Sequence, residues 1–515
     1  MTEQDDPTES VPGEPDLFLE QEVEEVVTRA PLTAKRVAIV GVRMVAGVVG
    51  LGVAVATVAA SVLLPLPTVS STAPSVLVTP VPTAQQLVCA GSVLRLADDT
   101  GQGATTSSAI GLPSVRSDSS SGAVDSVPLS QSDASTGGTN AAPLVISTPP
   151  NPADPTEVIL LSGAQAQQVT EGEFVGLAAA ACTAVSGDTW LVGGATTVGR
   201  TTLLTLSNPT EVPATVNLEL YGERGLITAP GTSGIVVPAS GQRVLSLAGF
   251  APNVESPVVR VMSTGGQVTA ELQQSIVRGL DPGGLDIIGA GTGPALETVI
   301  PGLRVAEIVT VETLLAGGAG FGDLATVLRL FAPGEGTVET TISVAPEDGV
   351  GAGSSIAFEL DAGRVTEVPI PDLADGSYTV RVESNRPLVA AVRVSSAAPA
   401  PEGEPIATDF AWLSSASELV TQAQVTVASG PNPVVHLANP TTAAASVSLT
   451  GGGEDVVVEL PAGASTSIPV DGGDTYTLGG FDRLYAAVSL AGDGMIARYS
   501  ARPVGAGSTA ILIYP

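Results

Sequence analysis

The sequence predicts a mainly β protein of tandem immunoglobulin-like sandwich units, preceded by one N-terminal transmembrane helix. Three observations lead to this prediction. Glycine (59 residues) and proline (40) are abundant among 515 residues, and both disfavour helix interiors. From about residue 186 onward, apolar and polar residues alternate with the period of two that strands with one buried face show. A charge-free run near the N-terminus is long enough to cross a bilayer. A propeller-like array of the same strands is the alternative arrangement.

Residues 1–43 are expected to form an acidic cytoplasmic tail, because they carry ten acidic and four basic side chains, a net charge of −6. Residues 44–66 then contain no charge over 23 residues, which as a helix would span roughly 34 Å. Basic residues lie just before this run, and the next charged residue is Arg95. The positive-inside rule therefore places the N-terminus in the cytoplasm and the rest of the chain outside. A cleaved signal peptide is the alternative, although its apolar part is usually shorter.

Residues 67–88 are rich in Pro, Thr, Ser and Val and are expected to form a stalk. Residues 89–185 follow as a segment that contains the only two cysteines of the chain, Cys89 and Cys182. Within it, the Ser, Gly, Asp, Thr and Pro content of residues 98–155 predicts a mobile, disordered loop. Because both cysteines are expected in an oxidising compartment, we predict a disulfide between them. Two unpaired buried thiols are the alternative.

Three related β units are expected at residues 186–295, 296–404 and 405–515. Each begins with a strand that ends in a proline turn, within LLTLSNP, LRLFAPG and VVHLANP. A second strand follows, then two strands around a turn of Pro or Asp, Ala, and Gly or Ser, and then a final hairpin. This spacing, with six or seven short strands in each unit, fits tandem immunoglobulin-like sandwiches. Trp190 and Trp412 precede the first and third units and are expected to pack in the core.

Several of these features occur together in one known family. They are Cys89, Cys182 followed by Trp190 and a Gly-Gly pair, and the two strands that end in Asn208-Pro209 and Asn439-Pro440. Over roughly residues 85–510 the chain resembles a family of uncharacterised actinobacterial envelope proteins that share a domain of unknown function. The resemblance implies a β fold and an envelope location, and it implies no activity.

The sequence offers little for catalysis or metal binding. His436 is the only histidine, and its place on a strand beside an Asn-Pro turn is more typical of a packed residue than of a catalytic base. One histidine and two distant cysteines cannot supply a zinc site. The acidic turns at residues 346–349 and 471–474 could offer oxygen ligands to calcium but match no EF-hand. The run GAGTG at residues 289–293 lacks the βαβ context of a dinucleotide loop and is expected to join two units. We therefore expect no catalytic residue, cofactor or metal.

The charge of the chain also restricts its partners. Residues 44–515 carry 42 acidic and 16 basic side chains, a net charge of −26, and such a field repels nucleic acid. The sequence thus predicts a single-pass cell-membrane protein whose β units form a non-catalytic scaffold or interaction surface of the cell envelope. Its partners would be the membrane and an envelope protein or glycan. The alternative is a glycan-binding accessory protein in envelope polysaccharide assembly. A hydrolase is a third hypothesis, and it requires a deep cleft with two close carboxylates.

Overall fold

The computed structural model describes residues 44–55, 76–78, 84–96, 107–131, 134–136, 141–151, 153–154, 158–170, 172–318, 320–349, 353–399, 406–453, 455–503 and 511–513. A helix occupies residues 44–55, within the predicted span 44–66, and all of its residues are exposed. No helix in the described part of the chain is both long and apolar enough to cross a membrane. The predicted tail 1–43 and residues 56–66 lie outside the described ranges.

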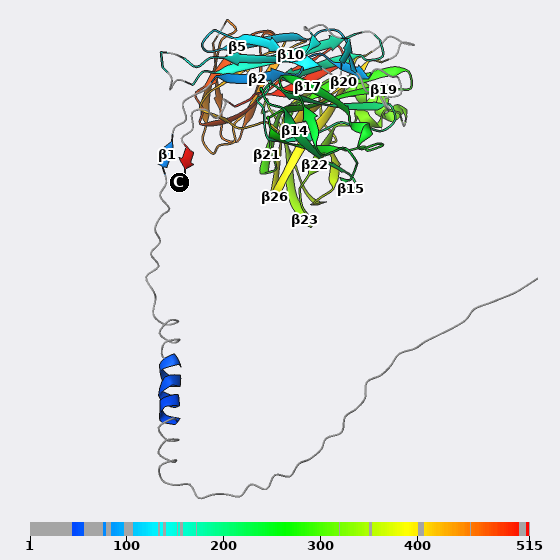
Figure 1. Ribbon diagram of the computed structural model, residues 1–515. Helices are drawn as coiled ribbons and strands as arrows, with labels where there is room; N and C mark the ends of the chain where they lie inside the picture. The colour runs from blue at the N-terminus through cyan, green and yellow to red at the C-terminus, as the bar shows by residue number, and fades with distance from the viewer. Residues whose placement is uncertain are drawn as a thin grey trace, which may run out of the picture. The chain divides into compact units, whose positions relative to one another are not determined.

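Strands dominate Leu77–Ile513, which clusters as one compact unit (Figure 1). The predicted alternation is visible as alternating burial on β14 (Ala214–Gly222), where Val216 and Leu218 are buried and Thr215 is exposed. The prediction of a mainly β fold is confirmed. The strands β1 (Val76–Val78) and β37 (Ile511–Ile513) pair with each other in a separate two-stranded sheet.

The first predicted unit contains two sheets. Its strands are β12 (Asp188–Val192), β13 (Arg200–Asn208), β14, β15 (Gly225–Ile227), β16 (Ile235–Val237), β17 (Gly241–Ser246), β18 (Val258–Gly265), β19 (Thr269–Arg278) and β20 (Asp281–Ile288), with the 3-10 turn η2 (Leu247–Gly249). One sheet has the order β12-β18-β14-β15, with β16 also on β14, and the other has the order β20-β19-β13-β17. Side chains from both sheets, such as Leu206 and Leu218, belong to one hydrophobic cluster.

The second predicted unit repeats this arrangement with one change. It contains β21 (Ala295–Val305), α2 (Ile308–Gly317), η3 (Gly322–Leu324), β22 (Val327–Phe331), β23 (Thr337–Pro346), β24 (Ser354–Asp361), β25 (Val365–Pro369) and β26 (Gly376–Ala397). The strand β27 (Thr408–Ser414) pairs with β26 and completes this set, although it lies beyond the predicted boundary at residue 404. The first part of β26 pairs with β21 and β23, and its last part pairs with β22 and β27. The predicted final hairpin is wrong in this unit, because β26 runs from one sheet into the other without turning back. It is also wrong in the first unit, where β18 and β19 lie in different sheets.

The third predicted unit repeats the order again. Its strands are β28 (Leu419–Val420), β29 (Ala423–Thr426), β30 (Val434–Ala438), β31 (Ala445–Thr450), β32 (Val456–Leu460), β33 (Ser465–Pro469), β34 (Thr475–Gly479), β35 (Arg483–Gly492) and β36 (Met495–Ser500). The sheet β29-β34-β31-β32 corresponds to β12-β18-β14-β16 of the first unit. The sheet β33-β30-β35-β36 corresponds to β17-β13-β19-β20. In both units the strands on either side of the predicted Ala-containing turn lie in different sheets.

Two buried asparagines explain why the Asn-Pro turns recur. Asn208 donates from Nδ2 to the carbonyl oxygens of Val212 (2.8 Å) and Val237 (3.3 Å), and its Oδ1 accepts the N–H of Thr210. Asn439 makes the corresponding bonds in the third unit, to Ala443, Leu460 and Thr441. Each asparagine thus connects the turn that follows its own strand to a strand of the other sheet of the unit, β16 for Asn208 and β32 for Asn439. Neither side chain is exposed, so these amides satisfy backbone groups that water does not reach.

The segment predicted at residues 89–185, which carries both cysteines, contains a fourth set of strands with the same order. Residues 85–88, predicted as the end of the stalk, belong to its first strand. The strands of this set are β2 (Gln85–Cys89), β3 (Leu94–Leu96), β4 (Ser107–Ala109), β5 (Ser114–Ser119), β6 (Asp125–Pro128), β7 (Ser130–Gln131), β8 (Ala134–Thr136), β9 (Leu144–Thr148), β10 (Leu161–Val169) and β11 (Gly176–Ala181). The sheet β2-β9-β6 corresponds to β12-β18-β14, and β11-β10-β5 corresponds to β20-β19-β13. A small sheet β3-β4-β8 is added, and β7 extends the sheet of β17.

The prediction of a mobile loop over residues 98–155 is wrong for residues 107–131 and 144–148. The polar composition is compatible with strands because β5 and β6 are edge strands that point most of their side chains into solvent. Their backbones gain hydrogen-bonding partners from β10 and β9, whose residues are mostly buried. A strand that joins an existing apolar sheet needs few apolar residues of its own.

The last strands of the four sets contact one another in a closed cycle, in the order β11, β20, β27, β36 and back to β11. Asp409 on β27 lies at the centre of this cycle. One of its carboxylate oxygens, Oδ2, accepts the N–H groups of Leu177 on β11 (2.9 Å) and Ile496 on β36 (3.1 Å). The other, Oδ1, accepts the N–H of Leu285 on β20 (3.1 Å). One buried side chain therefore ties all four strands together.

Candidate functional site

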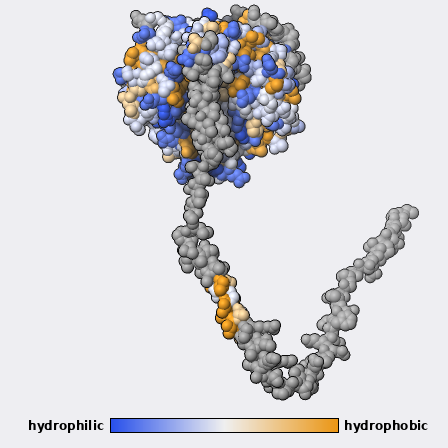
Figure 2. Space-filling view, turned by 60° about the vertical axis from the view of Figure 1, so that its left-hand side comes forward, coloured by the Kyte–Doolittle hydropathy of each residue, from blue (hydrophilic) through white to orange (hydrophobic). Residues whose placement is uncertain are grey.

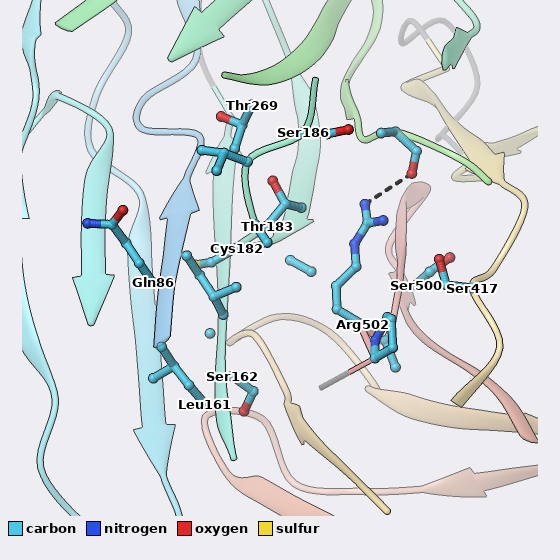
Figure 3. A pocket seen from close by; sticks show the side chains of 18 of the residues that line it. Gln86, Leu161, Ser162, Cys182, Thr183, Ser186, Thr269, Ser417, Ser500 and Arg502 are labelled. Carbon is cyan, nitrogen blue, oxygen red and sulfur yellow. Dashed lines mark hydrogen bonds between the residues drawn. The ribbon is translucent and has the colours of Figure 1, made fainter. Parts of the chain in front are cut away.

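A cleft of about 700 Å³ opens at the carboxyl ends of β11, β20 and β36. The residues that follow these strands form part of its wall, and β2, β10, β19 and β29 complete it. Figure 3 shows the side chains that face one another across it. Its volume lies in the range of pockets that hold small ligands. The recurring strand order explains where the cleft lies. Because β11, β20 and β36 occupy equivalent positions in their sets, their carboxyl ends lie close together.

Arg502 supplies the positive charge of the cleft. Its Nη2 donates to the carbonyl oxygen of Ala290 (3.0 Å), the bond drawn in Figure 3. Its Nε is buried and has no hydrogen-bond partner among the described residues. Burial lowers the pKa of the guanidinium, and the nearby Glu271 raises it. The guanidinium therefore retains donor capacity that the described part of the chain does not use.

The carboxylates near the cleft are compensated in two different ways. Asp188 is the acidic residue in the lining, and Arg260 binds it through two bonds, Nε to Oδ1 (3.0 Å) and Nη2 to Oδ2 (2.7 Å). Glu271 lies behind the wall and is 4% exposed. Burial raises the pKa of Glu271 to about 7, although the charge of Arg502 opposes this shift. Near neutral pH, Glu271 therefore cancels the charge of Arg502 only in part.

Most of the remaining polar lining is uncharged. Gln86, Thr183 and Ser417 have side chains with no hydrogen-bond partner within the described ranges, and all three are labelled in Figure 3. The backbone of Thr183 is fixed, because it exchanges two hydrogen bonds with Val88 (2.8 and 2.9 Å). Ser162 is already bonded to Thr426 (2.6 Å). The cleft thus offers hydroxyl and amide groups of fixed position to a polar ligand.

The predicted disulfide lies in the wall of the cleft. The sulfur atoms of Cys89, at the end of β2, and Cys182, just after β11, are 1.97 Å apart. Both residues are 1% exposed and pack against Ile146. The bond links the two sheets of the N-terminal set and holds β11 beside β2. Its role in this structure is to fix the wall that carries Thr183.

A family of unknown function, DUF5719, matches residues 134–478, which is about two thirds of the chain. The chain belongs to this family. No curated protein matches it, and no solved structure matches it. The matched range of the DUF5719 chain runs from β8 to β34 and includes Thr183 and Ser417. Gln86, on β2, and Arg502, two residues after the end of β36, lie outside it and also line the cleft.

His436 of the DUF5719 chain lies away from the cleft in a buried hydrogen-bonded chain. Its Nδ1 is 2.6 Å from Oε2 of Glu347, and its Nε2 is 2.7 Å from Oγ of Ser489. Oε1 of Glu347 accepts the N–H of Gly302 (2.9 Å) and the hydroxyl of Thr379 (2.8 Å). The order serine, histidine, acid is that of a hydrolase triad. However, the side chains of His436 and Glu347 are 0% exposed and Ser489 is 0% exposed, so no substrate reaches them in this structure.

The hydrogen bonds of Glu347 also argue against calcium binding at residues 346–349, because both of its carboxylate oxygens already have partners inside the protein. Within the described ranges, no three His, Cys, Asp or Glu side chains gather as metal ligands. Residues 289–293 form a loop between β20 and β21, and Ser415 Oγ accepts the N–H of Thr292 (3.0 Å). Two glycines of this loop, Gly291 and Gly293, line the cleft.

The tryptophans are packed as predicted. Trp190 is 5% exposed and Trp412 is 2% exposed, and both belong to the same hydrophobic cluster. The guanidinium of Arg329 lies 4.2 Å from the ring centroid of Trp412. Sequence reasoning missed Arg502, Gln86, Thr183 and Ser417. None of them stands in a recognisable motif. The repeat could have indicated two of them, because Thr183 and Arg502 each lie two residues after the end of equivalent strands, β11 and β36.

Proposed function

We propose that this DUF5719 protein is a non-catalytic, membrane-anchored scaffold of the cell envelope, and that the cleft is its binding site. Residues 44–66 would form the anchor, with residues 1–43 in the cytoplasm and the β units outside. The proposal is supported by the basic residues before the apolar run and by the disulfide, which is typical of oxidising compartments. The actinobacterial envelope resemblance supports the same location.

The single observation that carries the binding role is the composition of the cleft. Its lining contains one carboxylate, Asp188, which Arg260 already binds, and it contains no histidine among the described residues. Two free carboxylates, as a glycosidase uses, are not side by side there. Uncharged hydroxyl and amide groups suit recognition better than acid–base chemistry.

A glycan-binding accessory role is the second candidate, and the same lining favours it. Gln86, Thr183 and Ser417 offer donors and acceptors that complement sugar hydroxyls. The exterior of the protein, by contrast, offers a mixture of polar and scattered apolar residues on the face shown in Figure 2. A cleft that combines these polar groups with apolar side chains such as Leu161 and Val425 is therefore a more specific site for a saccharide than that face.

Protease accessibility tests the proposed topology. Protease added to intact spheroplasts that express the chain with an N-terminal tag should degrade the residues after 67 and spare the tag. Permeabilised spheroplasts serve as the control, in which the tag is also lost. Cleavage of the tag in intact spheroplasts, together with protection of the β units, would overturn the proposed orientation.

A further inference from the structure

Arg502 has an arrangement that a purely structural arginine does not need. For comparison, the buried guanidinium of Arg498 bonds Pro301, Ser414 and Ser500. Arg393 also has a buried Nε without a partner among the described residues, but its guanidinium lies over the ring of Trp412 and does not line the cleft. Arg502 makes one bond, to Ala290, and leaves a buried Nε without a partner in the described part of the chain. The Nε itself is too buried for a ligand to reach. Nη1 of the same guanidinium has no hydrogen bond among the described residues and is not buried, so a ligand in the cleft can accept from it.

The position of Arg502 makes its donors available to such a ligand. The side chain extends from the end of β36 toward the segment that carries Thr183 and Ser186 (Figure 3). Asp188 is the other charged residue of the lining, and its two oxygens are bound by Arg260. No carboxylate of the lining therefore competes for Arg502.

We infer that the cleft binds a sugar that carries a carboxylate, such as a uronic acid, with the carboxylate on Arg502. The planar guanidinium fork matches a carboxylate. Among the described residues, Arg502 is the one cation of the lining, and the one carboxylate of the lining, Asp188, is already bound by Arg260, so a single negative charge on the ligand balances Arg502. Phosphate carries a charge of −1.5 to −2 near pH 7, so a phosphate group would leave an uncompensated charge near Glu271. The sugar hydroxyls would bond to Thr183, Ser417 and Gln86.

The net charge of the protein restricts the ligand further. Residues 44–515 carry a net charge of −26, which repels polyanions over a Debye length of about 8 Å at physiological ionic strength. A ligand with isolated carboxylates, or one acidic residue in a neutral glycan, fits this field better than a chain with a charge on every sugar. This inference rests on the glycan-binding candidate above and names its ligand class.

Calorimetry with defined probes tests the inference on the full chain in detergent. The probes are D-glucuronate, the neutral methyl ester of D-glucuronic acid, D-glucose and inorganic phosphate. We expect glucuronate to bind most tightly. Arg502→Gln should weaken glucuronate binding roughly 10- to 100-fold, the factor expected for hydrogen bonds to a charged group, and leave glucose binding unchanged. The matched control Arg224→Gln, at an exposed turn, should bind as the wild type does.

A second variant keeps the test valid if Arg502→Gln folds poorly. Thr183→Val preserves the side-chain shape and both backbone bonds to Val88 but removes the hydroxyl, and it should weaken glucuronate binding several-fold. Equal affinity for the acid and its methyl ester, or an unchanged affinity in Arg502→Gln, overturns the inference but leaves a neutral-glycan role possible. Preference for phosphate overturns it as well. Absence of binding to every sugar removes both the inference and the glycan-binding candidate, whereas the membrane topology is tested separately.

Discussion

Removing the carboxylate of Asp409 should destabilise the whole β unit, because this side chain joins the last strands of all four sets. In Asp409→Ala the N–H groups of Leu177, Leu285 and Ile496 lose their acceptor at once. Asp409 is 1% exposed, so water does not replace the lost oxygens without entering the packed cycle. Each orphaned N–H costs about 1–3 kcal/mol, and the variant should therefore lose roughly 3–9 kcal/mol of unfolding free energy.

Two measurements check this prediction. Guanidinium unfolding can be followed by tryptophan fluorescence, since Trp190 and Trp412 are both buried in one cluster. Relative to the wild type, hydrogen exchange in the variant should accelerate more at the amides of Leu177, Leu285 and Ile496 than at amides on strands outside the cycle, such as β14. The control is Asp281→Ala, at the exposed start of β20, which should shift unfolding by less than about 0.5 kcal/mol. A wild-type midpoint for Asp409→Ala with unchanged protection of the three amides would refute the reasoning.

Two further predictions concern the disulfide and a buried acid. Reducing the Cys89–Cys182 bond, or replacing both cysteines by serine, should lower the free energy of unfolding by about 4 kcal/mol because the bond closes a sequence separation of 93 residues; equal denaturation midpoints with and without reductant would contradict this. The Glu271 carboxyl keeps its proton up to about pH 7 when folded and loses it near pH 4.5 when unfolded, so the free energy of unfolding should fall as the pH rises through that window, by roughly 3 kcal/mol. Denaturation of wild type and Glu271→Gln at pH 5 and pH 8 measures this, and the variant should lack that part of the pH dependence.

The strands were predictable from sequence because burial on one face imposes a period of two. The partners of the strands were not. On β19, Thr269, Glu271 and Gln273 read as a solvent face, yet all three are buried. The amide of Gln273 bonds the backbone of Leu94, 179 residues away (Leu94 N to Oε1, 2.7 Å). Alternation separates apolar from polar faces, but it does not distinguish a polar face in water from one that bonds another set of strands.

The Ser-rich segment and β26 show the same limit in other ways. Composition predicted disorder for residues that pair with β9 and β10, since local composition does not register a sheet supplied by distant residues. β26 was expected to turn back as a hairpin, whereas it continues for 22 residues because the two sheets accept its two ends. Whether a strand turns back or continues into a second sheet depends on which strands are available to pair with it. A local sequence pattern does not contain that information.

By itself, the sequence determined that the chain is mainly β and that it contains a charge-free apolar run with basic residues before it, and it predicted the disulfide that the structure shows. These properties follow from local composition, from the periodicity of apolar residues, and from the presence of two cysteines in the chain. Only the tertiary structure decided that the strands form four sets rather than three, and that Asp409 joins them. It also brought Arg502 beside Thr183 and assembled Ser489, His436 and Glu347 away from solvent. Those groupings depend on which strands end at the same place, and residues more than 300 positions apart meet there only after folding.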